Sequence, residues 1–152
     1  MNESDPVRMV DISEKTVSFR TAVAEGEIVL QPSTVEAIRT QSTKKGDVLT
    51  VSEIAGIQAA KKTDEIIPLC HQIPLTSVNI SFAFTEDRIH GTCTVKTTYS
   101  TGVEMEALVG VTTALLSIWD MVKYLEKDEG GQYAVARLEN IRVVLKENRE
   151  HA

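Results

Sequence analysis

Alternating apolar and polar positions mark several strands along this chain. The segments 78–84 and 89–95 each place every second side chain on one face, which predicts a hairpin of two half-buried strands. The segment 17–30 alternates β-branched and small residues around Gly26, and it predicts a hairpin or two short strands that turn at this glycine. A last strand is expected around residues 141–145, where apolar residues again alternate.

Helical periodicity is strongest between residues 103 and 126. Apolar residues recur there at intervals of three and four and predict one buried stripe, made of Leu108, Val111, Leu115, Ile118, Val122 and Leu125. Two shorter helices are expected at about 33–43 and 51–63. Each begins with a capping box, a serine or threonine with a glutamate three positions later, namely Ser33 with Glu36 and Thr50 with Glu53.

The order of these elements predicts the fold class. The second half reads strand, strand, helix, strand, which indicates an α+β fold with a ferredoxin-like antiparallel sheet and helices packed on one face. A length of 152 residues favours one domain. Residues 1–10 are polar and are expected to form a flexible N-terminal segment, followed by a single catalytic domain over residues 11–152.

Composition narrows the class of protein. A hydrophobic content of 42% and a charged content of 25% are ordinary for a soluble globular domain. The net charge of −6 argues against a nucleic-acid partner, because such binding needs a basic face. Cys70 and Cys93 make no disulfide framework, which favours a reducing cytoplasm. We expect no membrane partner, since we identify neither a signal peptide nor an apolar run of spanning length.

The long helix also has a second face of small or polar residues: Glu106, Gly110, Thr113, Ser117, Asp120 and Tyr124. This face is either an ordinary solvated side or a surface that a ligand or another chain approaches closely. Glu106 and Asp120 are separated by 14 positions, or roughly 21 Å along a helix. One small reacting centre cannot contact both, so either the ligand is long or subunits share the site.

Several cations and a histidine flank the second predicted helix. Lys45 precedes Gly46, Lys61 lies near the end of an Ala/Gly-rich segment, and His71 follows a proline and an apolar run. Such a group suits a phosphorylated small molecule. The alternatives are that the lysines solubilise the surface, that Lys61 interacts with the helix dipole, and that His71 is a satisfied core histidine.

The candidate carboxylates also allow two interpretations. Asp120 and Lys123 lie three positions apart, as either a surface ion pair or an acid/base pair. Glu104 either forms a capping box with Thr101 or contributes a carboxylate to a site. Arg20 is likewise either one charge on a strand or a planar phosphate clamp.

The adjacent Cys70 and His71 are awkward metal ligands, and no further ligands follow at zinc-like spacing. No metal is therefore expected.

Five ordered motifs together carry a specific resemblance: Lys45-Gly46-Asp47-Val48, Ala55-Gly56-Ile57-Gln58-Ala59-Ala60-Lys61, Ile67-Pro68-Leu69-Cys70-His71, Thr101-Gly102-Val103-Glu104-Met105-Glu106-Ala107-Leu108 and Trp119-Asp120-Met121-Val122-Lys123. From Met9 to about Lys127 the chain closely resembles the cyclic pyranopterin monophosphate synthase family, the molybdenum cofactor biosynthesis protein C family. It departs from many relatives in having Gln72-Ile73-Pro74 directly after the histidine and in lacking a glycine/lysine-rich tail.

The resemblance implies a lyase that converts (8S)-3′,8-cyclo-7,8-dihydroguanosine 5′-triphosphate to cyclic pyranopterin monophosphate and pyrophosphate, without a cofactor. It implies a homo-oligomer, a hexamer built as a trimer of dimers, with sites at subunit interfaces. We expect Asp120, Lys123 and Lys45 to be catalytic. We expect the substrate-binding residues to be Leu69, Cys70, His71, Met105, Glu106, Lys61, the less specifically matched Arg20, and Glu104.

These residues suggest a division of roles and leave rival functions open. Lys45, Lys61 and Arg20 would neutralise phosphates, while Asp120 and Lys123 would transfer protons. Glu106, with Cys70 and His71, would hold the guanine-derived edge. The alternative is a noncatalytic nucleotide-sensing ferredoxin-like module, and a simple pyrophosphohydrolase is a third reading. The sequence does not assign acid and base.

Overall fold

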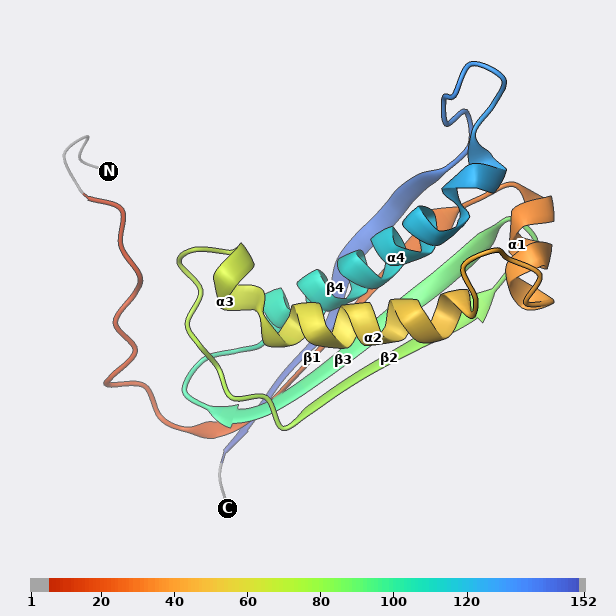
Figure 1. The fold of residues 1–152 in the computed structure, drawn as a ribbon. Coiled ribbons are helices and arrows are strands. Elements are labelled where there is room, and N and C mark those ends of the chain that lie inside the picture. Colours follow the sequence, from red (N-terminus) through yellow and green to blue (C-terminus); the bar gives the residue numbers. More distant parts are fainter. Residues whose placement is uncertain (1–5, 151–152) are drawn as a thin grey trace.

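The sheet is organised around a central strand, β1 (Ser18–Val29), which pairs antiparallel with both β3 (Arg88–Tyr99) and β4 (Arg137–Glu150). The strand β2 (Ser77–Phe84) lies outside β3, which gives the order β2-β3-β1-β4. The computed structural model, which describes residues 6–150, shows helical connections between β1 and β2 and between β3 and β4 (Figure 1). This is the predicted ferredoxin-like α+β fold, and the predicted 78–95 hairpin is confirmed as β2 and β3.

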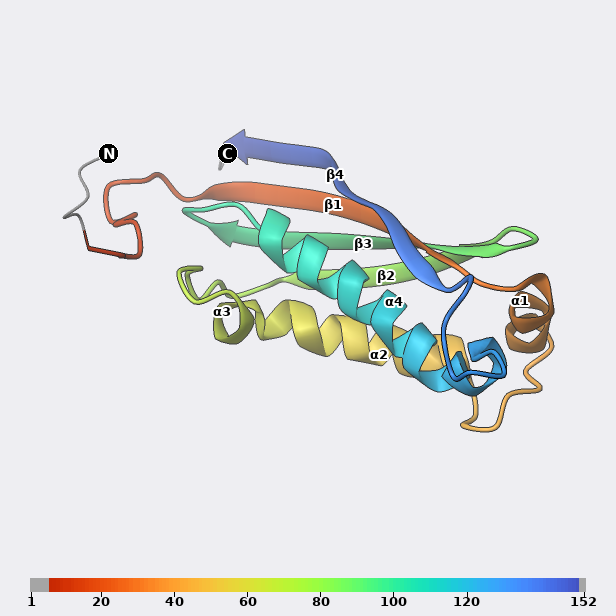
Figure 2. The same ribbon diagram turned by 90° about the horizontal axis from the view of Figure 1, so that it is seen from above.

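The helices are α1 (Pro32–Arg39), α2 (Val48–Lys61), α3 (Thr63–Ile66) and α4 (Glu104–Glu126). The two long ones, α2 and α4, lie side by side over one face of the sheet (Figure 2). A Cβ on Gly56 of α2 would lie 2.8 Å from the carbonyl oxygen of Gly110 on α4, so the two backbones meet there. The small-residue face of α4 therefore admits another helix of the same chain at this point.

The apolar stripe of α4 supplies much of the core. Val111, Leu115, Ile118 and Val122 are fully buried, and Leu108 and Leu125 pack at the margin, as predicted. By length and apolar composition α4 meets the criteria for a membrane-spanning helix, contrary to the expectation that no run reaches that length. Half of its most apolar window is buried inside this fold, as packing against the sheet requires.

Gly26 does not make the turn predicted for residues 17–30. The strand β1 runs through it without interruption, and Gly26 pairs with Gly91 of β3. Side-chain carbons of Leu115 lie 3.0 and 3.3 Å from the positions where Cβ atoms on these two glycines would be. At Gly26 the atom closest to the Cβ position is Ile141 Cδ1 of β4. The two glycines thus make room for Leu115 of α4 and, at Gly26, for Ile141 of β4, and the hairpin prediction is wrong because packing, not a turn, requires them.

The predicted capping boxes are also wrong. The first residue of α1 is Pro32, and its N-cap Gln31 has no side-chain cap; the Glu126 carboxylate accepts from the Gln31 N–H at 3.1 and 3.3 Å and from the Thr34 hydroxyl instead. Asp47, not Thr50, caps α2 and accepts the Thr50 N–H. At the start of α4 the N-cap is Val103, and no side chain caps it. At α1, the carboxylate of Glu126, far away in the sequence, takes the place of a local cap, and local spacing does not reveal such a contact.

Candidate functional site

A cavity of about 590 Å³ lies at the N-terminal end of α4, where the segment after α3 passes the start of that helix. It brings together six predicted site residues from two distant segments, Leu69, Cys70, His71, Glu104, Met105 and Glu106. The turn at residues 67–70, with its Cys70 N–H donating to the Ile67 carbonyl at 3.1 Å, directs the first three toward α4. The remaining lining residues are Ile73, Thr101, Gly102, Val143 and Lys146.

Glu106 is the unusual ionisable group of this cavity. The residue is 3% exposed, and burial is the main reason why the pKa of its carboxyl rises to about 6. The nearby negative charges of Glu104 and Asp64 raise the pKa further. A carboxyl with this pKa exchanges protons readily near neutral pH, which is the property expected of a general acid or base.

Cys70 offers a hydrogen bond rather than nucleophilic attack, and His71 offers the hydrogen-bonding nitrogens of its ring. Burial, followed by the charges of Glu106 and Asp64, raises the pKa of the Cys70 thiol, so the sulfur stays protonated. His71 Nε2 lies 2.6 Å from the Val10 carbonyl oxygen. Because a carbonyl only accepts, Nε2 carries the proton, and Nδ1 is the acceptor in the neutral ring.

Sequence reasoning missed the contribution of β4 to the cavity. Val143 and Lys146 line it, and Lys146 Nζ lies 3.0 Å from a Glu104 carboxylate oxygen. Glu104 therefore pairs with a cation across the cavity instead of capping α4. Strand alternation alone would put these two residues, three positions apart, on opposite faces. The register shift between Val23 and Ala24 in the pairing of β4 with β1 changes this relation, and a local pattern does not reveal such a shift.

The three residues predicted to be catalytic meet elsewhere, near the C-terminal end of α4. Asp120 Oδ1 lies 3.0 Å from Lys123 Nζ, and Asp120 Oδ2 lies 3.3 Å from Lys45 Nζ. Hydrogen bonds from Lys123 and then Lys45 lower the pKa of Asp120, and the bond to Asp120 raises the pKa of Lys123. Both pKa shifts favour the ionised forms of Asp120 and Lys123. A charged lysine is what anion binding and charge stabilisation require, whereas a lysine acting as base would need a lowered pKa.

The structure does not bring this second cluster to the cavity within one chain. Glu106 lies in the first turn of α4, whereas Asp120 and Lys123 lie in its last two turns. The helix between them is continuous, so the separation is roughly 21 Å, as the sequence predicted. Figure 1 shows the same division, with α3 beside one end of α4 and α1 beside the other.

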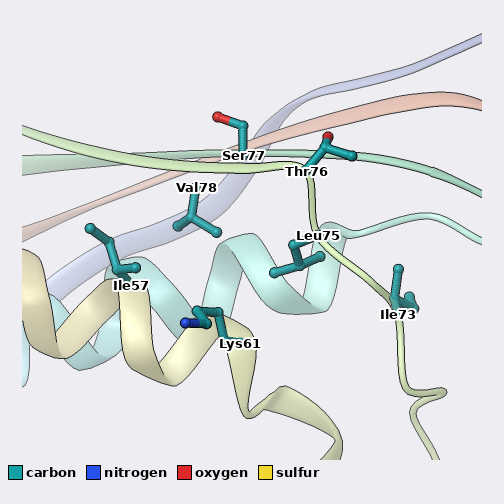
Figure 3. A pocket seen from close by; sticks show the side chains of 7 residues that line it. All are labelled: Ile57, Lys61, Ile73, Leu75, Thr76, Ser77 and Val78. Carbon is teal, nitrogen blue, oxygen red and sulfur yellow. The ribbon is translucent and has the colours of Figure 1, made fainter.

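Lys61 and Arg20 lie outside both groups. Lys61 extends from the last turn of α2 into a hollow of about 440 Å³ that Ile57, Leu75 and Ser77 also line (Figure 3). Ile73 lines this hollow and the larger cavity, so the two adjoin. Arg20 Nε donates to the Tyr99 carbonyl oxygen at 3.1 Å, and Arg20 lines a third hollow of about 320 Å³.

A metal site was not expected from the sequence. Among residues 6–150, no group of three or more histidine, cysteine, aspartate or glutamate side chains is arranged to hold a metal ion. The ionisable groups of the cavity are instead a buried carboxyl, a second carboxylate paired with lysine, a thiol and an imidazole. Such groups bind and exchange protons with a polar organic ligand.

Comparison with known proteins gives consistent matches. The model of the MoaC family matches residues 9–148. A probable cyclic pyranopterin monophosphate synthase from Thermococcus kodakarensis is 59% identical over 140 residues, which cover 92% of this chain and 90% of the relative. One from Pyrococcus furiosus is 55% identical, with 96% and 94% covered. A Methanothermobacter thermautotrophicus protein, named as a probable accessory protein of that synthase, is 53% identical, with 95% and 91% covered.

Proposed function

This chain belongs to the MoaC family, and we propose that it converts (8S)-3′,8-cyclo-7,8-dihydroguanosine 5′-triphosphate to cyclic pyranopterin monophosphate and pyrophosphate in molybdenum cofactor biosynthesis. The synthase relatives align over nearly their full length. The observation that carries the proposal is the cavity of about 590 Å³, which gathers the family's Leu-Cys-His and Glu-Met-Glu segments around a carboxyl of raised pKa. Residues 11–152 act as the single catalytic domain.

The cavity suits the guanine-derived part of the substrate. Opening the five-membered ring and closing the pterin ring move protons between nitrogen, oxygen and carbon. Glu106, with a pKa of about 6, accepts a proton in one step and returns it in another. Cys70 and His71 supply hydrogen-bonding groups beside it, and the pair of Glu104 and Lys146 at the edge of the cavity confines the polar edge of the ring.

The second cluster suits the phosphates. Lys45 and Lys123 are held beside Asp120 and stabilise the negative charge that develops as pyrophosphate leaves. Asp120 sets the spacing of the two cations, and its hydrogen bond raises the pKa of Lys123, which keeps that lysine charged beside the phosphates. Lys61, whose hollow adjoins the Glu106 cavity, and Arg20 would neutralise further phosphates of the substrate. No metal or organic cofactor is expected.

A complete site then needs two chains. We propose that the Lys45–Asp120–Lys123 cluster of one subunit faces the Glu106 cavity of another, in a cytoplasmic hexamer built as a trimer of dimers. An apolar groove of about 320 Å³ beside the cavity supports this arrangement, because its residues Ile66 and Leu116 are 53% and 50% exposed. Exposed apolar surface of this kind marks protein interfaces.

The test is turnover of the cyclised dihydro-GTP, with pyrophosphate and pterin product measured together. The parent is expected to form both, the Lys123→Ala variant neither, and the Lys127→Ala variant, which removes an exposed lysine one turn later, both. Substrate binding without products would favour the nucleotide-sensing module. Release of pyrophosphate from ordinary GTP without pterin would favour a hydrolase, and either outcome would overturn the proposal.

A further inference from the structure

Lys45 lies on an exposed loop, Thr40–Asp47, that connects α1 to α2. The Thr43 hydroxyl donates to the Gly46 carbonyl oxygen at 2.8 Å, and Asp47 caps the following helix. Gly46 has a φ of +101°, with no atom near the position of a Cβ, so the glycine serves a left-handed turn rather than a close approach. These contacts shape the loop internally but do not orient it toward α4.

The side chain of Tyr124 connects the backbone of this loop to α4. The Lys44 N–H donates to the Tyr124 phenol oxygen at 2.9 Å, and Lys44 Nζ lies 4.8 Å from the centroid of the Tyr124 ring. Within residues 6–150, this is the only hydrogen bond from the loop's backbone to α4. Tyr124 thus holds the backbone at the residue immediately before Lys45.

The Lys45–Asp120 pair needs such support. The two side chains are 49% and 59% exposed, and exposed ion pairs contribute little because ordering long side chains offsets the attraction. Tyr124 lies one helical turn after Asp120 and next to Lys123, so one stretch of α4 carries two members of the cluster and the support for the third.

We infer that Tyr124 is a positioning residue: its phenol oxygen fixes the Lys44 backbone so that Lys45 reaches Asp120. The expected effect on turnover rests on the proposed function, whereas the positioning of Lys45 by Tyr124 does not. Tyr124 contributes through Lys45 alone, so its effect disappears when the lysine is absent.

The experiment is a double-mutant cycle between Tyr124→Phe and Lys45→Met. Tyr124→Phe keeps the ring under Lys44 and removes only the oxygen that accepts the N–H. In the parent we expect a two- to tenfold rise in KM, about the value of one hydrogen bond. In the Lys45→Met background we expect no further change, whereas a merely structural role would give the same rise in both. Equal effects in both backgrounds, or none in the parent, would overturn the inference.

A second readout needs no substrate. Lys45 is one of the two cations that lower the pKa of Asp120, Lys123 being the other. Tyr124→Phe should therefore raise the pKa of the Asp120 carboxyl toward its ordinary value, measured by carbon-13 NMR of the full chain, with no change in the Lys45→Met background. A raised pKa in a protein without turnover would support the positioning role and refute the proposed function. An unchanged pKa would refute the positioning role.

Discussion

Glu106→Gln gives a strong prediction, because stability and catalysis respond in opposite directions. The residue is 3% exposed, and burial beside Glu104 and Asp64 raises the pKa of its carboxyl from an ordinary 4.5 to about 6. Ionising Glu106 in the folded protein is therefore unfavourable. The amide of glutamine has nearly the same shape and carries no charge, so the substitution removes this cost together with the proton-transfer group.

The sign and size of the difference in unfolding free energy between the variant and the parent follow from proton linkage. Below pH 4.5 the carboxyl is protonated in both the folded and the unfolded chain, and the substitution changes little. As the pH rises from 4.5 to about 6, the folded state retains the proton longer, so the parent loses stability relative to the variant. Above that range the difference is constant, at about 2 kcal/mol in favour of Glu106→Gln.

The assay is denaturant unfolding of both proteins at several pH values between 4 and 8. The difference in unfolding free energy should grow through the interval 4.5–6 and then stay level, while turnover of the cyclised substrate is lost. Glu53→Gln, an exposed substitution on α2, is the matched control and should shift neither quantity. A variant that is equally or less stable at pH 8 would refute the reasoning, since Glu106 would then not be a destabilised carboxylate.

Three further predictions test other parts of the account. Asp120→Asn should lower turnover at least a hundredfold, roughly 3 kcal/mol of lost transition-state stabilisation, yet change unfolding stability by less than about 1 kcal/mol, because its ion pairs are exposed. Gly56→Ala should cost about 1–3 kcal/mol in denaturant unfolding, since its Cβ would lie 2.8 Å from the Gly110 carbonyl oxygen; exposed Gln58→Ala is its control. Glu126→Ala should cost about 1–3 kcal/mol, because the Gln31 N–H and the buried Thr34 hydroxyl lose their acceptor; circular dichroism and urea melts measure the loss.

The periodic parts of this fold were predictable from the sequence. Alternation identified β2 and β3, and the apolar stripe identified α4 to within one residue of its start, because both elements bury one regular face. Gly26 was misread as a turn, since a glycine that accommodates the side chains of Ile141 and Leu115 has the same local sequence signal as one that turns the chain. The Glu126 cap of α1 spans 95 positions, so no local pattern could show it.

The candidate site was predictable as a set of residues but not as a geometry. Helical rise alone separated Glu106 from Asp120, and the continuous α4 confirms that separation. The raised pKa of Glu106 depends on burial by neighbours from several elements, and the role of Lys146 depends on how β4 pairs with β1. Both need tertiary contacts between segments whose own sequences carry no sign of them.

The most direct test of the shared site mixes two inactive proteins. Glu106→Gln disables the cavity, and Asp120→Asn disables the Lys45–Asp120–Lys123 cluster. Mixed oligomers can be made by coexpression with different affinity tags. If each site combines halves from two chains, an equal mixture should recover about a quarter of the parent's synthase turnover, because some sites draw both intact halves. Mixed oligomers as inactive as either variant, beside an active parent treated in the same way, would contradict the account.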